Sequence, residues 1–244
     1  MERDETDQVE IKQKYPFRDG CVFCKISEGN EPARYLAPDG VETEDRSGVS
    51  GDGPLAFRNR LTWLRVMALV VPPGHPSQEQ MWTDRDLYVP LIPYALALGR
   101  ELTIDNLPDD TAPEGFRAIS NFGRIAHQSQ DHAHVHIITR PDYEAMPEVK
   151  ADAPPLDASS GDIVVESAEV ISAPWSVRIT LAGITTQEKM WADPRLPDLI
   201  DSTIALAEKE SPEGYRLAAE FLPVDGLGPA GLFILGGGQL DLYA

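Results

Sequence analysis

The sequence contains few cysteines and few histidines, and the shortage of cysteine already excludes one class of protein. Among 244 residues there are two cysteines and five histidines. Two cysteines cannot build the disulfide framework of a small secreted domain. The N-terminal segment, MERDETDQVEIKQKYPF, lacks the apolar core of a secretory signal. We therefore expect a cytoplasmic protein whose thiols are reduced.

Long apolar runs and an excess of positive charge are also missing. No apolar stretch reaches the roughly 18 residues that a membrane span needs, although a hydrophobic content of 42% is enough for a packed core. The net charge of −19 opposes binding to nucleic acid polymers and to anionic membrane surfaces. It leaves open a small anionic ligand that is held in a local pocket.

Two sequence blocks occur twice in the same order. QEQMWTD at 78–84 returns as QEKMWAD at 187–193, an offset of 109, and APEGFRAISNF at 112–122 returns as SPEGYRLAAEF at 211–221, an offset of 99. This pattern predicts an internal duplication in which each half is a β–β–helix–β–β unit. The expected fold class is α+β, with antiparallel sheets and flanking helices.

The predicted organisation follows from this duplication and from local composition. The predicted helix begins at a capping Asp84, and the apolar run at 61–75 predicts a strand that ends in a turn. The remaining predicted segments are a loose leader at 1–16, a first domain at 17–145 with a long loop at 38–54, a helix at 84–101, strands at 116–123 and 132–140, a linker at 146–162 and a second repeat at 163–244.

The two halves differ in their chemistry. The offset of 99 aligns HAHVH at 132–136 with GLFIL at 231–235, and the second half contains no histidine. The second repeat is therefore degenerate, and we expect the chemistry to lie in the first.

Three histidines alternate along one predicted strand. Residues i, i+2 and i+4 of a strand share one face, so His132, His134 and His136 would project together over roughly 13 Å. That span is too long for all three to reach one metal, although two of them could. Cys21 and Cys24 form a C-x2-C pair, which alone is ambiguous between zinc ligation and redox chemistry.

These residues carry a resemblance to a known family. The segments CVFCKISEGNEPA, LAFRNRLTWLRVMALVVPPGHPS and NFGRIAHQSQDHAHVHIITR, within about residues 21–140, resemble the histidine triad superfamily of nucleotide hydrolases and transferases. The family signature alternates histidine with apolar residues and ends in two apolar positions, as His132 to Ile138 do. The tandem organisation with a degenerate second repeat is similar to the galactose-1-phosphate uridylyltransferase branch.

The resemblance implies a role for each polar residue of the first half. His134 would be the nucleophile that forms a covalent nucleotidyl-imidazole, His136 would assist the leaving group, and Gln128 would contact the phosphate or the leaving group. Asn121 and Ser129 would also bind the nucleotide. Asn59, which precedes His75 at a spacing of 16 (75 − 59), would bind the ribose at a position where the simple hydrolases usually have Asp.

The resemblance to the transferase branch also implies a metal. Structural zinc would be bound by Cys21, Cys24, His75 and His132, which leaves His134 and His136 for the phosphate. One residue departs from that branch, because it usually has Gln at the position of His136. The resemblance therefore implies a nucleotide or nucleotide-sugar substrate, with hydrolysis and transfer both open.

Other classes of function remain open from the sequence alone. One alternative is a non-catalytic, zinc-stabilised nucleotide-binding protein. Another is a metal-dependent enzyme that uses His132 and His134 together as ligands. Single-repeat relatives form dimers, so the expected assembly is a monomer with pseudo-dimeric repeats or a homodimer.

Overall fold

The computed structural model describes most of the chain. The described residues are 5–49, 53–139, 148–149, 161–169 and 173–241. The chain divides into two compact units, residues 1–113 with 130–139 (unit 1) and residues 114–129 with 140–244 (unit 2). Most of the predicted linker at 146–162 lies outside the described residues. No described helix is both long and apolar enough to cross a membrane.

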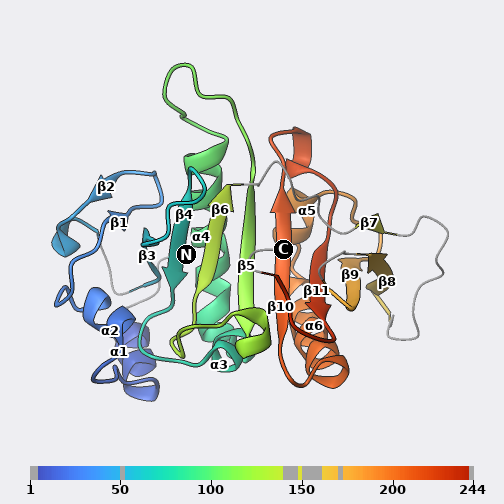
Figure 1. The fold of residues 1–244 in the computed structure, drawn as a ribbon, viewed down its shortest axis with the longest axis horizontal. Coiled ribbons are helices and arrows are strands. Elements are labelled where there is room, and N and C mark those ends of the chain that lie inside the picture. Colours follow the sequence, from blue (N-terminus) through green and yellow to red (C-terminus); the bar gives the residue numbers. More distant parts are fainter. Residues whose placement is uncertain (1–4, 50–52, 140–147, 150–160, 170–172, 242–244) are drawn as a thin grey trace. The chain divides into compact units, whose positions relative to one another are not determined.

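Unit 1 is an antiparallel sheet with helices. Its strands follow the order β2-β1-β3-β4-β6, and helix α4 contacts β4 and β6 (Figure 1). Its elements are α1 (Glu5–Lys14), α2 (Val22–Ser27), β1 (Tyr35–Leu36), β2 (Glu42–Thr43), the 3-10 helix η1 (Arg46–Gly48), β3 (Leu55–Arg58), β4 (Met67–Val71), α3 (Gln78–Thr83), α4 (Arg85–Thr103) and β6 (Val135–Thr139).

Helix α4 begins at the predicted cap. The Asp84 side chain accepts a hydrogen bond from the backbone N–H of Asp86, which satisfies one of the free donors of the first turn. Leu87, Leu91 and Leu98 lie on one face at helical spacing and are fully buried. This apolar face attaches α4 to the sheet of unit 1.

Unit 2 is also an antiparallel sheet with helices. Its strands follow the order β5-β10-β11-β9-β8-β7, and α6 contacts β9 and β11. Its elements are β5 (Phe116–Phe122), η2 (Arg124–Ala126), β7 (Glu148–Val149), β8 (Ile163–Glu169), β9 (Trp175–Leu181), α5 (Gln187–Trp191), α6 (Leu196–Glu210), β10 (Tyr215–Phe221), η3 (Asp225–Leu227) and β11 (Leu232–Gly236).

The strand registers repeat between the two halves of the chain. Ala56 pairs with Val70 in β3 and β4, and at the offset of 109 Val165 pairs with Ile179 in β8 and β9. This shared register is structural evidence for the duplication, in addition to the sequence identity that suggested it. The fold class is α+β, with a repeated strand pattern.

The register corrects one sequence alignment. Ala68 pairs with Ile137, and its counterpart Val177 pairs with Ile234, so the last strands are offset by 97 (234 − 137) and not by 99. The connection between the last two strands is two residues shorter in the second half, 222–231 against 123–134. HAHVH therefore corresponds to PAGLF at 229–233, and not to GLFIL at 231–235.

Strands β5 and β10 pair around a local twofold axis inside unit 2. Ile119 pairs with Ala218, which is its own counterpart at the offset of 99. The axis passes through this pair, so each residue pair on one side of it has an equivalent pair on the other side. Stacked aromatic rings lie at both ends of this strand pair, with centroids 4.5 Å apart for Phe116–Phe221 and 4.2 Å apart for Phe122–Tyr215.

The structure corrects one local prediction and refines two others. Residues 5–14 of the predicted loose leader form α1, whose end is held by Lys14 Nζ and the Tyr15 hydroxyl at 2.7 and 2.9 Å from a carboxylate oxygen of Asp84. The predicted loop at 38–54 contains β2 and η1. The strand predicted within 61–75 is present as β4 but begins only at Met67, because the mostly exposed residues 60–65 form an irregular connection after β3.

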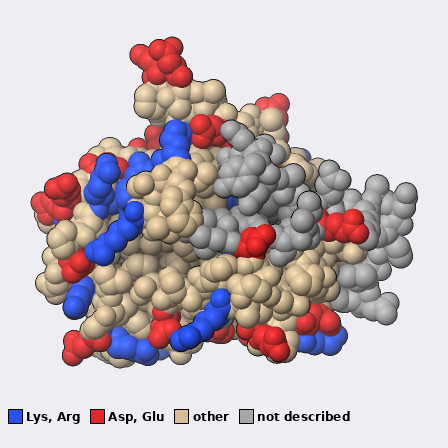
Figure 2. All heavy atoms as spheres, in the orientation of Figure 1, with Lys and Arg blue, Asp and Glu red and all other residues tan. Residues whose placement is uncertain are grey.

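Basic side chains are unevenly placed on the acidic chain. Figure 2 shows Lys and Arg gathered over the region that Figure 1 draws as β1 to β3. Arg58 and Arg34 both pair there with Glu42 of β2. Exposed pairs of this kind contribute little stability, and we assign them no functional role.

Two glycines at equivalent positions of the repeats should differ in how much their replacement by alanine destabilises the protein. Gly74 and Gly183, counterparts at the offset of 109, have φ of +77° and +78°. A Cβ at Gly74 would lie 2.3 Å from the carbonyl oxygen of Tyr15, whereas at Gly183 it would meet nothing within 4 Å. Gly183→Ala should therefore lower the free energy of unfolding by only about 1 kcal/mol, the cost of left-handed backbone.

Gly74→Ala should cost about 2 kcal/mol more, because Tyr15 must move and its 2.9 Å hydrogen bond from the N–H of His75 is lost. Urea denaturation of the two variants measures the difference. Equal losses would contradict the contact between Gly74 and Tyr15.

Candidate active site and metal centre

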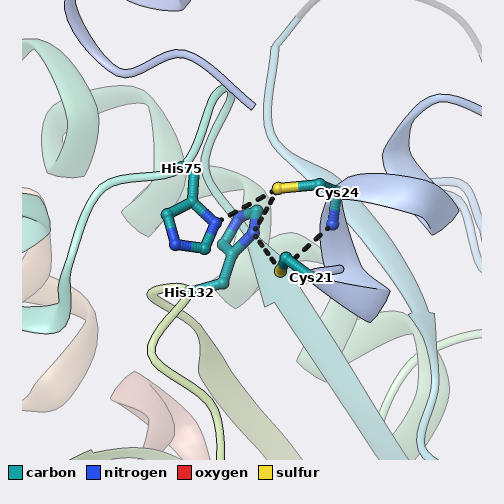
Figure 3. A group of neighbouring side chains, drawn as sticks. All are labelled: Cys21, Cys24, His75 and His132. Atoms are coloured by element: carbon teal, nitrogen blue, oxygen red, sulfur yellow. Dashed lines mark hydrogen bonds between the residues drawn. The ribbon is translucent and has the colours of Figure 1, made fainter. Parts of the chain in front are cut away.

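Two cysteines and two histidines converge in unit 1. The ligand atoms of Cys21, Cys24, His75 and His132 all lie within 4.8 Å of one another. Figure 3 shows the four side chains pointing toward one another, with the sulfur atoms facing ring nitrogens. Cys24 Sγ lies 3.1 Å from His75 Nδ1 and 3.5 Å from His132 Nδ1, and Cys21 Sγ lies 3.6 Å from His132 Nδ1.

Three separate elements deliver these side chains. Cys21 caps α2 and Cys24 lies in its first turn, where the backbone N–H of Cys24 donates to Cys21 Sγ at 3.5 Å. His75 follows β4 after a turn at Gly74, and its N–H donates to the carbonyl of Tyr15. His132 precedes β6. The cluster therefore links the helix, the turn and the strand.

The donor set and its spacing fit a tetrahedral metal ion. Zinc bonds of about 2.3 Å to sulfur and 2.0–2.1 Å to nitrogen give tetrahedron edges of roughly 3.3–3.8 Å, close to the 3.1–3.6 Å between sulfur and nitrogen atoms here. Two thiolates with two imidazoles are a common zinc ligand set. These four residues could therefore hold such an ion.

Burial opposes charge on the isolated ligands. It raises the pKa of Cys24 to about 12, and the neighbouring Cys21 thiol adds to this effect. Burial also lowers the pKa of His75, and it lowers that of His132 to about 3 with help from His75 and His134. Neutral imidazoles are ready to ligate, while the thiols need a cation to favour their thiolate form.

His134 lies just before β6 and is held by a side chain, not by a neighbouring strand. Gln78 Oε1 accepts from the His134 N–H, and Gln78 Nε2 donates to the His134 carbonyl, both at 3.0 Å. Gln78 is fully buried in the first turn of α3. This two-point contact replaces the strand ladder at His134, so the predicted strand at 132–140 begins at Val135 instead.

The ring of His134 is fixed by the residue two positions earlier. His134 Nδ1 lies 2.9 Å from the carbonyl oxygen of His132. A carbonyl oxygen can only accept, so Nδ1 carries the hydrogen, and the lone pair of the neutral ring is on Nε2. Burial lowers the pKa of His134, which favours this neutral form.

Two rings flank His134. The His136 ring lies 4.8 Å from it, centroid to centroid, and the Phe23 ring lies 5.3 Å from it in an edge-on arrangement. Phe23 also contacts the His132 ring at 5.8 Å. Phe23 lies between Cys21 and Cys24 in sequence, so one aromatic side chain contacts both the Cys–His cluster and His134.

The remaining predicted nucleotide-binding residues lie in both units. Asn59 is half-buried in unit 1, and its Oδ1 accepts from the N–H of Leu61. Asn121, Gln128 and Ser129 belong to unit 2. Asn121 is buried, while Gln128 Oε1 accepts from the N–H of Gly123 at 2.8 Å.

Sequence reasoning missed Gln78, although a signal for it was present. Its motif repeats as QEKMW, and Gln187 makes the equivalent contacts to the N–H and carbonyl of Gly231 at 3.3 and 2.9 Å. Gly231 is the counterpart of His134 at the offset of 97. The motif is shared because both halves need the same clamp on the peptide before their last strand.

Removing either clamp should destabilise the protein. Gln78→Met leaves a buried N–H and a buried carbonyl of His134 unpaired, and we expect a loss of about 2–4 kcal/mol in the free energy of unfolding. Gln187→Met should cost at least as much, because Gln187 also accepts from Trp191 Nε1. Chemical denaturation gives both values, and an unchanged Gln78→Met variant would refute the clamp.

The two variants should differ at the histidine. Only Gln78→Met should shift the ring signals of His134 in NMR spectra, because Gln187 holds Gly231. Equal shifts in both variants would show that the change at His134 is a general loss of structure.

The chain is similar in sequence to known proteins over about half of its length. It is 31% identical over 124 residues to adenosine 5'-monophosphoramidase of Candida albicans, spanning 50% of this chain and 71% of that protein. The equivalent enzyme of Schizosaccharomyces pombe is 29% identical over 124 residues, 51% of this chain and 77% of that one. A histidine triad-like protein of Methanocaldococcus jannaschii is 28% identical over 131 residues, 53% and 84%.

No protein-family model matches the chain. Among solved structures, a histidine triad protein from Clostridium difficile has a TM-score of 0.41 at 24% identity, over 53% of this chain and 97% of that one. Yeast Ap4A phosphorylase with AMP has a TM-score of 0.49 at 14% identity, over 79% and 58%. Both scores are below 0.5, so the family rests on the sequence relatives. On their identity and coverage, the chain belongs to the histidine triad superfamily of nucleotide hydrolases and transferases.

Proposed function

We propose that the protein cleaves or transfers a nucleoside monophosphate through a covalent intermediate on His134. The observation that carries this proposal is the 2.9 Å contact between His134 Nδ1 and the His132 carbonyl, because it leaves the lone pair on Nε2. A neutral imidazole with its Nε2 lone pair available is a competent nucleophile near neutral pH. The names of the sequence relatives favour an adenosine 5'-phosphoramidate as substrate.

The proposed reaction has two displacements at phosphorus. In the first, a bond forms between His134 Nε2 and phosphorus, the bond from phosphorus to the leaving group breaks, and His136 gives a proton to that group. In the second, water or another hydroxyl acceptor attacks phosphorus and gives its proton to His136, the bond to Nε2 breaks, and the nucleotide is released with the ring of His134 neutral again. The His132 carbonyl stabilises the positive charge that develops on the ring during the first step.

Neutral donors complete the proposed site. Asn121, Gln128 and Ser129 would donate to phosphoryl or leaving-group oxygens, as the family resemblance implies. At Asn59, the Oδ1 is already occupied by the N–H of Leu61. Asn59 would therefore meet the ribose with its Nδ2 donor, whereas a carboxylate would accept from the sugar hydroxyls.

The second repeat would have a structural role. All five histidines lie in the first half, and β5 finds its partner strand β10 within the same chain. The pairing that a homodimer would otherwise supply is thus present in one chain. We propose a monomer with pseudo-dimeric repeats.

We also propose that the bound metal is zinc with a structural role. The four ligands at 21, 24, 75 and 132 close the coordination sphere and leave no position for substrate. In this role, zinc would fix the backbone at His132, whose carbonyl orients His134. The chemical steps themselves would be carried by the two histidines alone.

The zinc proposal predicts one zinc per chain in the purified protein. Cys21→Ser should lose the metal and about 4 kcal/mol of stability, the value for a site held at a thousand times its Kd. Elemental analysis and thermal denaturation measure both effects. His127→Gln is the matched control, because His127 lies outside the cluster, and it should keep its zinc. Protein that contains no zinc, or stoichiometric iron, would contradict the proposal.

The nucleophile proposal predicts a trapped adduct. Wild-type protein that is quenched in acid-free buffer with adenosine 5'-phosphoramidate should gain the mass of one adenylyl group, and His134→Ala should not. Turnover by His134→Ala should fall by about 10⁴-fold or more, while AMP binding and zinc content stay nearly unchanged.

His136→Gln provides the internal control for this experiment. It keeps a hydrogen-bond donor and the nucleophile, so the adduct should still form while its turnover slows. Full activity of His134→Ala would exclude the mechanism. Loss of zinc from His134→Ala would instead favour a metal-ligand role for His134, and nucleotide binding without turnover or adduct in the wild type would favour a non-catalytic protein.

A further inference from the structure

Two buried arginines lie on the β5–β10 pair in unit 2, one on each strand. Arg117 and Arg216 are counterparts at the offset of 99, and their exposed fractions are 1% and 0%. Each reaches across to the residue directly paired with it on the other strand, Arg117 to Glu220 and Arg216 to Asn121. Glu220 is itself the counterpart of Asn121. The two contacts are therefore related by the local twofold axis.

The two arginines differ in the groups that they contact. Arg117 Nε lies 3.4 Å from a carboxylate oxygen of Glu220, a residue of the repeat without histidine. Arg216 Nε donates to Asn121 Oδ1 at 2.7 Å, and its Nη2 lies 3.4 Å from the carbonyl oxygen of Ala126. Ala126 belongs to the short turn that leads to Gln128. One guanidinium thus contacts Asn121 and the turn that leads to Gln128.

This geometry fixes the orientation of the Asn121 amide. A guanidinium N–H needs an acceptor, so the oxygen of Asn121 faces Arg216 and the amide nitrogen faces the other way. Turning the amide over would place N–H against N–H at a buried site, which is unfavourable. A charged donor on Oδ1 also polarises the amide and strengthens its N–H groups as donors.

We propose that Arg216 is a positioning residue that acts through Asn121, because it holds the amide oxygen and leaves Nδ2 as the group that can donate. The proposal rests on the function proposed above, because it requires that Asn121 donates to the substrate. Arg117, in the twofold-related position, contacts Glu220 of the half that has no histidine. The two arginines therefore occupy equivalent positions on the paired strands, but only Arg216 contacts a residue that is proposed to bind the substrate.

Conservative variants separate these roles. Lys keeps the charge in both Arg216→Lys and Arg117→Lys, but an ammonium cannot reproduce the planar fork that reaches Asn121 and Ala126 together. With adenosine 5'-phosphoramidate, Arg216→Lys should lower kcat/KM by about tenfold to a hundredfold, as expected for the loss of an orienting partner. Arg117→Lys should stay within about twofold of wild type, although both variants should lower the melting temperature by similar amounts.

A double mutant tests whether the effect passes through Asn121. Asn121→Ala removes the donor, so adding Arg216→Lys to it should lower kcat/KM by no more than about twofold further. Losses that multiply in the double mutant would overturn the proposal. Equal losses of kcat/KM in Arg117→Lys and Arg216→Lys would also overturn it, because they would show a purely structural role.

NMR spectroscopy of the side-chain amides tests the geometry without any substrate. The Nδ2 signals of Asn121 should move in Arg216→Lys and remain unchanged in Arg117→Lys. Unmoved signals in Arg216→Lys would overturn the proposal even if activity fell. A wild-type protein that neither cleaves the phosphoramidate nor binds AMP would instead defeat the proposed function, and the two failures are therefore distinguishable.

A further variant covers the case in which Arg216→Lys does not fold. Asn121→Asp keeps an oxygen facing Arg216 and forms an ion pair with it, but it removes the amide donor. It should fold with at least wild-type stability and lose kcat/KM as Asn121→Ala does. Wild-type activity in Asn121→Asp would show that the nitrogen of Asn121 is not the working group, and would overturn the proposal.

Discussion

The hydrogen bond between His134 Nδ1 and the carbonyl oxygen of His132 is the interaction on which the rest of the candidate site depends. The side chain of His132 faces the two thiols while its carbonyl orients the ring of His134. His132 therefore contributes its side chain to the Cys–His cluster and its carbonyl to the orientation of the proposed nucleophile. Gln78 holds the backbone of His134 with two further hydrogen bonds, so the ring, the peptide and the cluster are linked by direct contacts. A free strand with three alternating histidines would have none of these constraints.

The duplication separates the groups that build the fold from those that perform chemistry. The strand registers and the glutamine clamp occur in both halves, because each half must anchor its last strand. Only the first half has imidazoles on and just before that strand. Their counterparts are Pro229, Gly231 and Phe233, and Phe233 packs in an apolar cluster with Leu235 and Leu240. The backbone that carries the proposed nucleophile in one half is covered by hydrophobic packing at the equivalent position in the other.

Much of this arrangement was accessible from the sequence, and the exceptions have physical causes. The duplication, the helix cap at Asp84 and the α+β class follow from motifs whose meaning is local. The offset of 97 does not, because a connection two residues shorter leaves no mark in a sequence where the histidines are gone. The role of Gln78 was hidden for a related reason: a clamp on backbone atoms places no demand on the identity of the residue it holds. Helix α1 was missed because contacts of Tyr15 with Asp84 and His75, distant in sequence, hold its end.

The location of β5 explains why a half without histidines is retained. This strand belongs by sequence to the first repeat, yet it pairs along its whole length with β10 of the second. Two identical subunits would place the same residues on both sides of such an axis. A fused pair has no such restriction, and here the axis relates Asn121 to Glu220 while both arginines remain. The second half could thus lack histidines while it keeps β10 and the buried Arg216, which contact β5 of the first half. Fusion makes this asymmetry possible, because each side of the axis is encoded separately.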